Sequence, residues 1–252
     1  MAITGASSGI GEALARAYGH ASNRLTIVAR RTERLQQLAT ELDAPTHSIT
    51  ADLSDLTTCC DWIDEAESTH GPIDLFLNNA GIQIVDPVLA VDPDRRDQLF
   101  RLDLLAPLRM IHRIAPGMVE RESGVVVNIS SVAGLVATPG MCHYNAAKSG
   151  FASFSEGLGW ELRSTGVHVV TVYPGPIRTA MEEKARKRLG GGFADLAPTG
   201  STEKLARLIV RAVSRKRRRV IYPRFYVVTR IFRGTAQWIT DRLTPPLKDR
   251  RD

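Results

Sequence analysis

The chain has 252 residues, of which 43% are hydrophobic and 24% charged, a composition that fits one globular domain with a full core better than two very small domains. No apolar stretch approaches the roughly 20 residues that span a bilayer, no signal peptide fits before the first glycine motif, and three cysteines without a Cys-x-x-Cys pair argue against a disulfide framework or a metal site. These features predict a cytoplasmic protein. Its net charge of +6 is unevenly distributed, because residues 215–252 hold 12 Lys and Arg against 3 Asp and Glu.

The apolar pattern alternates between strands and helices along the chain. A very short strand at residues 2–4 precedes the glycine-rich segment TGASSGIG, and further short apolar runs predict buried strands at Leu25–Ala29, Leu75–Leu77, Val125–Ile129, Val167–Tyr173 and Val220–Pro223. Helical spacing, or an N-cap aspartate followed by proline, predicts helices at Ile10–Tyr18, at Thr32–Leu42, from Asp92-Pro93 onward and at Tyr144–Leu162. This order predicts an α/β fold, a doubly wound parallel sheet with helices on both faces, as in Rossmann-like folds.

The segment TGASSGIG predicts a turn that binds phosphate. Glycine lets the backbone pass close to a pyrophosphate, and the helix that follows offers free N–H groups and the positive end of its dipole. The spacing G-x-x-x-G-x-G differs from the commonest dinucleotide fingerprint, so an ordinary glycine turn into a helix is the alternative. The residues expected to contact a dinucleotide are Gly5, Ser7, Ser8, Gly9, Ile10 and Gly11.

The end of the second predicted strand bears on the choice of dinucleotide. Folds that prefer NAD usually place an acidic residue here, which binds the 2′-hydroxyl of the ribose. Ala29 holds that position instead, and Arg30 and Arg31 follow, which suits the 2′-phosphate of NADP. Solvated arginines at the start of a helix are the alternative. We therefore expect NADP, with NAD as the less favoured cofactor.

Ser131, Tyr144 and Lys148 form a second pattern, within the run NISSVAGLVATPGMCHYNAAK. Lys148 follows Tyr144 by one helical turn, so both side chains project from one face, and its charge should lower the tyrosine pKa toward the working pH. Ser131 ends a predicted strand and can hydrogen-bond an oxygen that gains charge. The pattern predicts proton transfer at a carbonyl or alcohol oxygen while hydride moves at carbon. For Tyr-x-x-x-Lys alone, a surface helix pair would be the alternative.

Three shorter motifs occur in order along the chain, namely Asp52-Leu53, Asn78-Asn79-Ala80-Gly81 and Pro174-Gly175-Pro176-Ile177-Arg178-Thr179. Together with TGASSGIG, Ser131 and Tyr144-x-x-x-Lys148, they resemble the motifs of the short-chain dehydrogenase/reductase family over residues 1 to about 223. The resemblance implies an oxidoreductase in which Tyr144 is the general acid and base, Lys148 binds the nicotinamide ribose and Ser131 orients the substrate. It also implies that Asp52 and Leu53 flank the adenine, although a helix cap is the alternative for Asp52 taken singly. The remaining residues that the resemblance assigns to the cofactor are Asn79, Ala80 and Gly81, and the set Pro174, Gly175, Ile177 and Thr179, of which the last two would hold the nicotinamide carboxamide.

The chain departs from the family at two places. Asp103 stands where the family usually has an asparagine that supports a proton-relay water, so we expect altered activity and count Asp103 among the catalytic residues. The family also has several more residues before the glycine motif, which predicts either a truncated central strand or an initiation site upstream. A catalytically weak nucleotide-binding regulator is the alternative function, and Asp103 is its only support.

Residues 224–252 are expected to form a basic amphipathic tail beside a catalytic domain of residues 1–223. The tail would form a helix that packs on the domain or on a partner subunit, or that contacts an anionic membrane. An adaptor for membrane or nucleic acid is a third alternative, although no nucleic-acid motif is present and no nucleic-acid partner is expected. We further expect a homo-oligomer. The segment 180–200, expected to be a mobile loop, would shape the substrate pocket together with the tail, and its residues Met181, Leu189, Phe193 and Leu196 suggest an apolar, lipid-like small molecule. Cys142 and His143 are expected to line the same pocket.

Overall fold

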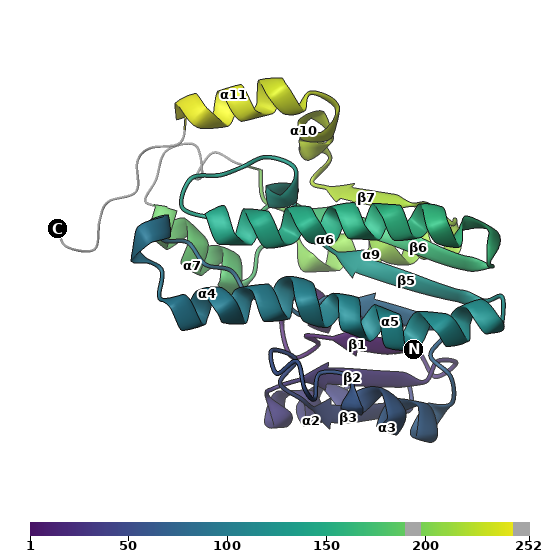
Figure 1. Ribbon diagram of the computed structural model, residues 1–252. Coiled ribbons are helices and arrows are strands. Elements are labelled where there is room, and N and C mark those ends of the chain that lie inside the picture. The colour runs from purple at the N-terminus through teal and green to yellow at the C-terminus, as the bar shows by residue number, and fades with distance from the viewer. Residues whose placement is uncertain (190–197, 244–252) are drawn as a thin grey trace.

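The computed structural model describes residues 1–189 and 198–243 of the chain, and these form an α/β fold around one twisted sheet (Figure 1). Seven strands within the described ranges pair in the order β3-β2-β1-β4-β5-β6-β7, and every neighbouring pair is parallel. The strands are β1 Ala2–Thr4, β2 Leu25–Ala29, β3 Thr46–Thr50, β4 Leu75–Asn78, β5 Gly124–Ile129, β6 Val167–Pro174 and β7 Arg219–Tyr222. The predicted doubly wound parallel sheet is therefore confirmed.

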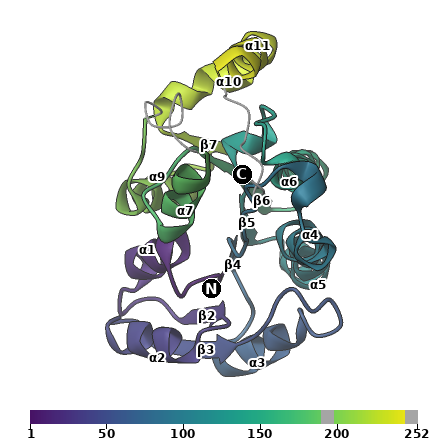
Figure 2. The ribbon, with the colours of Figure 1, turned by 90° about the vertical axis from the view of Figure 1, so that its left-hand side faces the viewer.

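Helices cover both faces of the sheet, as Figure 2 shows with the sheet seen along its edge. One face packs against α1 (Gly9–Tyr18), α2 (Thr32–Thr40) and α9 (Thr202–Ser214), and the other against α3 (Asp61–His70), α5 (Ala106–Glu120) and α6 (Cys142–Glu161). Neighbouring residues of β2 serve opposite faces, since Ile27 belongs to the first core and Val28 to the second. Both faces of the sheet are thus buried, which is why the strands read as unbroken apolar runs.

The strand that sequence patterning missed is β3. Its sequence THSIT contains one buried residue, Ile49, because β3 lies at the edge of the sheet and only partly under helices. The apolar signal that marks central strands is therefore weak there. The central strand β1 is three residues long and pairs with both β2 and β4.

The expectation of a loop at 180–200 is wrong for its first half. Residues 180–189 form helix α7 (Ala180–Leu189), while residues 190–197 lie outside the described part of the chain. Two i,i+4 ion pairs stabilise the helix, Glu182 with Arg186 at 2.9 Å and Glu183 with Lys187 at 2.7 Å. Its apolar residues are few and four apart (Met181, Ala185 and Leu189), which made the helical pattern easy to overlook.

The tail forms two helices where the sequence predicted one. After the 3-10 turn Arg224–Tyr226, α10 (Val227–Ile231) and α11 (Arg233–Leu243) meet at Phe232, whose ψ of 57° interrupts the helix. We call residues 224–243 the roof, because Figure 1 shows α10 and α11 lying across the end of the domain beyond β7. No helix in the described ranges is long and apolar enough to cross a bilayer.

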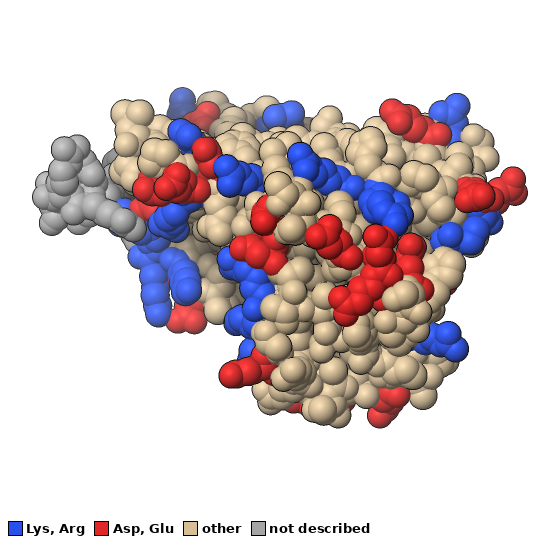
Figure 3. Space-filling view, turned by 60° about the horizontal axis from the view of Figure 1, so that its bottom comes forward, with Lys and Arg blue, Asp and Glu red and all other residues tan. Residues whose placement is uncertain are grey.

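Polar contacts from Gln237 and Arg230 fix the roof to the rest of the chain, and the Tyr226 hydroxyl adds a hydrogen bond to the Pro198 carbonyl at 3.4 Å. The Gln237 side chain accepts from the Ala137 amide at 2.8 Å and donates to the Ala137 carbonyl at 3.0 Å. Arg230 pairs with Glu156 of α6 at 2.7 Å, and Arg219 also donates to that carboxylate. Away from the roof, the face in Figure 3 carries acidic and basic side chains interspersed on a largely uncharged surface.

Candidate active site

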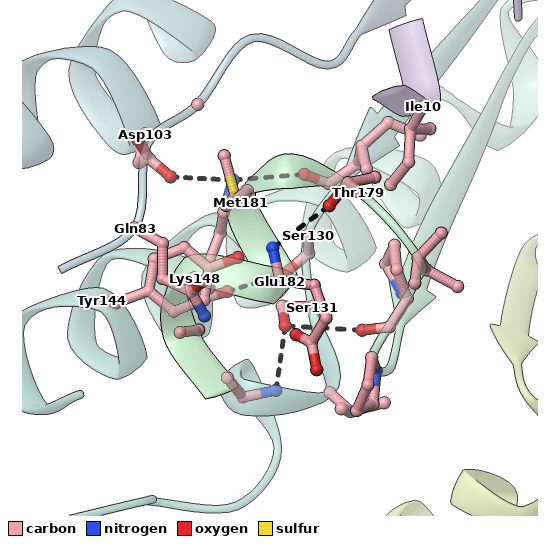
Figure 4. Close-up of a pocket in the computed structure, with 18 of the residues that line it drawn as sticks. Ile10, Gln83, Asp103, Ser130, Ser131, Tyr144, Lys148, Thr179, Met181 and Glu182 are labelled. Atoms are coloured by element: carbon pink, nitrogen blue, oxygen red, sulfur yellow. Dashed lines mark hydrogen bonds and ion pairs between the residues drawn. The ribbon is translucent and has the colours of Figure 1, made fainter. Parts of the chain in front are cut away.

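The site lies at the carboxyl ends of the central strands. In open parallel sheets, ligands bind where the strand order reverses, and here that point falls between β1 and β4. A cavity of about 620 Å³ opens there. Its walls come from the glycine turn after β1, the ends of β2 to β6, helix α7 and the roof, and Figure 4 shows part of this lining.

The glycine turn has the backbone geometry that its sequence requires. Gly5 and Gly9 have φ angles of 67° and 60°, a region that residues with a side chain rarely adopt. Gly11 does not line the cavity; a side chain there would collide with the Gly5 carbonyl, so its place is in the packing of α1 against the turn. Ser8 is the N-cap of α1 and makes no side-chain capping bond, which leaves the helix N-terminus facing the cavity with Ser7, Gly9 and Ile10.

The turn is held in place by the end of β4. The Asn79 side chain donates to the Thr4 carbonyl at 2.9 Å, and the Thr4 hydroxyl accepts from the amides of Asn79 and Ala80 at 3.0 and 3.1 Å. A Cβ on Gly5 would lie 2.9 Å from the Ala80 Cα, so the two segments touch. Asn79, Ala80 and Gly81 all line the cavity. Thr4, which the sequence analysis did not select, is the residue that joins the two motifs.

Arg30, Arg31, Asp52 and Leu53 line the end of the cavity away from Tyr144. Arg31 donates to the Ser7 hydroxyl at 3.0 Å and to the Ser7 carbonyl at 3.1 Å, which places its guanidinium beside the glycine turn. Arg30 is exposed. The Asp52 carboxylate accepts from the Ser54 amide and hydroxyl at 3.0 and 2.8 Å, so it also caps the turn after β3. This end combines two cations with a fixed carboxylate.

Ser131, Tyr144 and Lys148 line the opposite end of the cavity, where the structure brings them together as predicted (Figure 4). Ser131 follows β5 and its hydroxyl donates to the Pro174 carbonyl at 3.4 Å while accepting from the Ala133 amide at 3.1 Å. Tyr144 and Lys148 lie one turn apart on α6, with the ammonium nitrogen 5.8 Å from the centre of the tyrosine ring. Lys148 also donates to the Ile129 carbonyl at 3.3 Å, so β5 and α6 orient it jointly.

Asp103 is buried beside Lys148. It lies in the wide helical turn Arg101–Leu105, between α4 (Pro93–Phe100) and α5. Pro107 has no N–H for the Asp103 carbonyl four residues earlier, which accounts for the widened turn at this point. The carboxylate accepts from the Ile82 amide at 2.8 Å and lies 3.1 Å from the Lys148 nitrogen, with both side chains almost fully buried. The site thus has a buried ion pair where the family has an amide.

Burial decides the direction of the pKa shifts of Tyr144 and Asp103, whereas neighbouring charges decide that of Lys148. It raises the pKa of Tyr144; Lys148 acts against the rise, whereas the Asp103 charge adds to it. The expected lowering of the tyrosine pKa by Lys148 is thus outweighed in the protein alone. Burial alone lowers the pKa of Lys148, but the charges of Asp103 and Tyr144 raise it overall. Burial also raises the pKa of Asp103, although Lys148 and the Ile82 amide favour its charged form.

The segment after β6 closes the cavity between the glycine turn and α7. Pro174, Gly175, Ile177 and Thr179, the residues expected to contact the cofactor, all line it. The Thr179 hydroxyl accepts from the Glu182 amide at 3.2 Å, which caps the start of α7. A Cβ on Gly9 would lie 3.1 Å from the Thr179 methyl group, so this threonine packs on the glycine turn.

Most of the further lining residues were not named individually from the sequence. Those from α7, from the loop before α6 and from the roof are largely apolar or neutral, and they include Val136, Thr138, Met141, Glu182, Ala185, Arg186, Phe225, Tyr226, Val228, Thr229, Thr235, Ala236, Ile239 and Thr240. Gln83, which follows β4, also lines the cavity. Of the four apolar residues expected here from the segment 180–200, Met181 and Leu189 do line the cavity, and Phe193 and Leu196 lie outside the described part of the chain. Cys142 and His143 do not; Cys142 is exposed and His143 packs edge-on against Phe100, so that expectation is wrong. They precede Tyr144 at the start of α6, where the helix turns their side chains away.

The cavity fits an extended dinucleotide. Its glycine turn has the positive φ angles and the open helix N-terminus that a pyrophosphate requires, and cations lie at one end while Tyr144 lies at the other. A fold and crevice of this kind define the class of NAD(P)-dependent oxidoreductases with a doubly wound sheet.

Comparison with known proteins narrows the class. A family model described as short chain dehydrogenase matches residues 1–190. "Dehydrogenase/reductase SDR family member 7B" of Danio rerio is 30% identical over 248 residues, covering 93% of this chain and 80% of that protein. The chain belongs to the short-chain dehydrogenase/reductase family.

Solved structures of the family share the whole fold. A short-chain dehydrogenase from Sphingobium yanoikuyae in complex with NADPH has a TM-score of 0.80 at 25% identity, covering 100% of this chain and 98% of that one. The bulky-bulky ketone specific alcohol dehydrogenase from Comamonas testosteroni has a TM-score of 0.78 at 25% identity, covering 99% of this chain and 96% of that one. The chain is thus an NAD(P)-dependent oxidoreductase of this family.

Proposed function

We propose that the protein interconverts a carbonyl and a secondary alcohol by hydride transfer, with NADP(H) as cofactor and Tyr144 as general acid and base. The observation that carries the proposal is that Ser131, Tyr144 and Lys148 share one cavity with the glycine turn. Either motif alone would have an ordinary structural explanation, whereas their convergence on one cavity supports a reaction between a bound dinucleotide and a second ligand. The comparisons give no support to a catalytically weak regulator.

The residues divide the chemistry among them. A nicotinamide held in the cavity would supply or accept the hydride. Tyr144 Oη would give a proton to the carbonyl oxygen or take one from the alcohol. Ser131 Oγ, fixed by the Pro174 carbonyl, would hydrogen-bond the same oxygen as its charge changes. Lys148 favours the charged form of Tyr144, and its own charge is sustained by Asp103 in a water-poor site.

The preference for NADP rests on Arg30 and Arg31. Arg31 is held beside the glycine turn by Ser7, and Ala29 leaves no carboxylate to bind a 2′-hydroxyl or repel a phosphate. Arg30 is exposed and lines the same cavity, so its side chain can turn toward the phosphate. A solved relative in complex with NADPH supports this choice.

The substrate is proposed to be an apolar small molecule, because α7 and the roof face the cavity mainly with methyl, methylene and aromatic groups. The relative that acts on bulky ketones is consistent with such a pocket. We also propose a homo-oligomer in the cytoplasm and a catalytic unit of residues 1–223 whose pocket is completed by the roof.

Oxidation of NADPH by the purified protein with a panel of apolar ketones and aldehydes tests the proposal. Turnover that requires both the carbonyl and NADPH, and that is slower with NADH, is expected. Cofactor binding without turnover of any carbonyl or secondary alcohol would favour the regulator alternative instead.

A further inference from the structure

The roof carries an exposed apolar surface. Six large apolar side chains on residues 224–243 are at least one-third exposed, and they are Phe225, Val228, Ile231, Phe232, Trp238 and Ile239. The polar side chains that bind the roof to the domain, Arg230 and Gln237, are at most partly exposed and are engaged with Glu156 and Ala137. The roof helices are thus amphipathic, with their polar anchors toward the domain and an apolar face toward the outside.

This apolar face surrounds the mouth of the cavity. Phe225, Val228 and Ile239 are among the exposed side chains, and all three also line the cavity. Met181, from α7 on the other side of the mouth, is likewise 41% exposed and lines the cavity. A molecule that enters between α7 and the roof therefore passes over apolar groups that are continuous from the outer surface to the interior.

Basic side chains accompany the apolar face. Arg224, Arg233 and Arg242 of the roof are exposed, and Arg242 stacks on the Trp238 ring at 4.4 Å. Asp241 is the sole carboxylate between residues 224 and 243, so the roof is net positive. Tryptophan and arginine side chains with an apolar body and a polar or charged end favour the interface between lipid headgroups and acyl chains.

We propose that the roof rests on an anionic lipid surface and that the apolar substrate passes from the lipid into the cavity between α7 and the roof. Charge complementarity selects this occupant, since an isologous contact with a second copy would place two basic roofs against each other. The lipid contact stands on the surface alone, whereas the passage of substrate rests on the proposed oxidoreductase function.

Vesicle cosedimentation tests the lipid contact without cofactor or substrate. The protein is expected to bind vesicles that contain phosphatidylserine, to bind pure phosphatidylcholine far less, and to lose binding as salt is raised. Arg224→Glu should weaken binding at least about fivefold, because each basic residue near the surface contributes about 1 kcal/mol. Arg34→Glu, on exposed helix α2 far from the roof, should leave binding unchanged.

Two tryptophans provide a matched pair for the apolar contribution. Trp238 and Trp160 are 56% and 55% exposed, and each has an arginine stacked on it, Arg242 at 4.4 Å and Arg218 at 4.6 Å. Trp238→Glu should abolish sedimentation with anionic vesicles, whereas Trp160→Glu on α6 should not. Equal effects of the two variants, or no binding by the wild-type protein at low salt, would overturn the proposal. The proposal would also be overturned if the wild-type protein bound no vesicles and formed a dimer through the roof. Size-exclusion chromatography would reveal such a dimer if the wild type eluted as a dimer and Trp238→Glu as a monomer.

The passage of substrate is tested separately. With an apolar ketone that the enzyme reduces, kcat/KM should rise severalfold when the ketone is carried in anionic vesicles, and Trp238→Glu should lose that rise while matching the wild type in detergent solution. Trp238 does not line the cavity, so its substitution leaves the site intact. An identical rise in Trp238→Glu would overturn the passage of substrate through the lipid-facing mouth, and a protein that binds vesicles but reduces no ketone would refute the proposed function alone.

Discussion

The two ends of the cavity are built by different means. At the cofactor end, backbone groups and small side chains interlock: Asn79 bonds to Thr4, and Gly5 touches Ala80. At the substrate end, methionine, leucine, phenylalanine and isoleucine side chains from α7 and the roof form the wall. The first arrangement tolerates few substitutions because it depends on positive φ and on close backbone approach, whereas the second depends mainly on volume and polarity. Sequence therefore reports the cofactor end in detail and the substrate end only as apolar.

Substitution of Lys148 should have the largest effect at the junction of the two ends. Lys148→Ala is expected to lower kcat/KM by about 10³-fold and to weaken cofactor binding, because the ammonium is proposed to bind the ribose and to support Tyr144. The variant also leaves Asp103 buried without its partner, which should cost roughly 3–5 kcal/mol in the free energy of unfolding. Activity and urea denaturation, measured together, check both effects.

The double variant Lys148→Ala/Asp103→Asn is the control for that experiment. It removes the unpaired carboxylate, so stability should recover while activity should not. Recovery of activity along with stability would contradict a direct role for Lys148.

Replacement of Arg30 and Arg31 by methionine tests the proposed preference for NADPH at the cofactor end of the cavity. Binding of NADPH should weaken by about 2–4 kcal/mol with little change for NADH, since only NADPH carries the 2′-phosphate. Fluorescence titration with both cofactors measures the difference. Arg34→Met, about one helical turn further along α2 and outside the cavity, is the matched control and should bind both cofactors as the wild type does. Equal wild-type affinities for NADPH and NADH would contradict the preference.

Asp103→Asn should change the pH profile more than the maximum rate. The Asp103 charge raises the pKa of Tyr144, so its removal should lower that pKa. In alcohol oxidation, where tyrosinate is the base, the rising limb of the pH–rate curve should therefore move to lower pH, with equal or higher activity at the plateau. Asparagine retains an oxygen for the Ile82 amide, which protects the fold. A large loss of activity, without any displacement of the rising limb of the pH–rate curve, would show that Asp103 does not act through the pKa of Tyr144.

The smallest expected effect concerns the anchor of the roof. Burial opposes ionisation of Glu156, but hydrogen bonds from Arg219, Tyr173 and Arg230 outweigh it and lower its pKa to about 2. A depressed carboxyl pKa stabilises the fold above the unfolded-state value, and this stability is lost as pH falls toward the folded-state value. Arg230→Met should reduce the free energy of unfolding by about 1 kcal/mol near neutral pH.

That deficit should shrink as Glu156 becomes protonated, between its ordinary pKa of 4.5 and about 2. Urea denaturation at neutral and acidic pH follows the change. Arg242 stacks on Trp238 and is not paired with Glu156. The control variant Arg242→Met should therefore show no such pH dependence. A pH-independent deficit in Arg230→Met would mean that the residue contributes by packing only.

The fold was largely predictable because central strands and the glycine turn carry strong local signals. Leu25–Ala29 was predicted with its observed bounds, since all five residues are buried. Edge strand β3 and helix α7 were missed for a common reason: each buries only one residue fully, Ile49 and Ala185, so long-range packing and ion pairs define them more than an apolar pattern does.

The candidate site was predictable to the extent that its residues belong to motifs. Tyr144 and Lys148 are fixed by helical spacing, and Asp103 by its alignment with the family. The ion pair between Asp103 and Lys148, and the contact of Gln237 with Ala137, join segments far apart in sequence. Such contacts depend on how helices and loops pack side by side in the folded chain, which no local pattern reports.

Single-turnover hydride transfer in wild-type protein and Tyr144→Phe tests the central claim most directly, that one cavity joins the dinucleotide to an acid–base tyrosine. With NADPH saturating and an apolar ketone in excess, the loss of NADPH absorbance should be at least about 10²-fold slower in Tyr144→Phe, while NADPH affinity should remain nearly unchanged. A transfer rate close to that of the wild type would contradict the account.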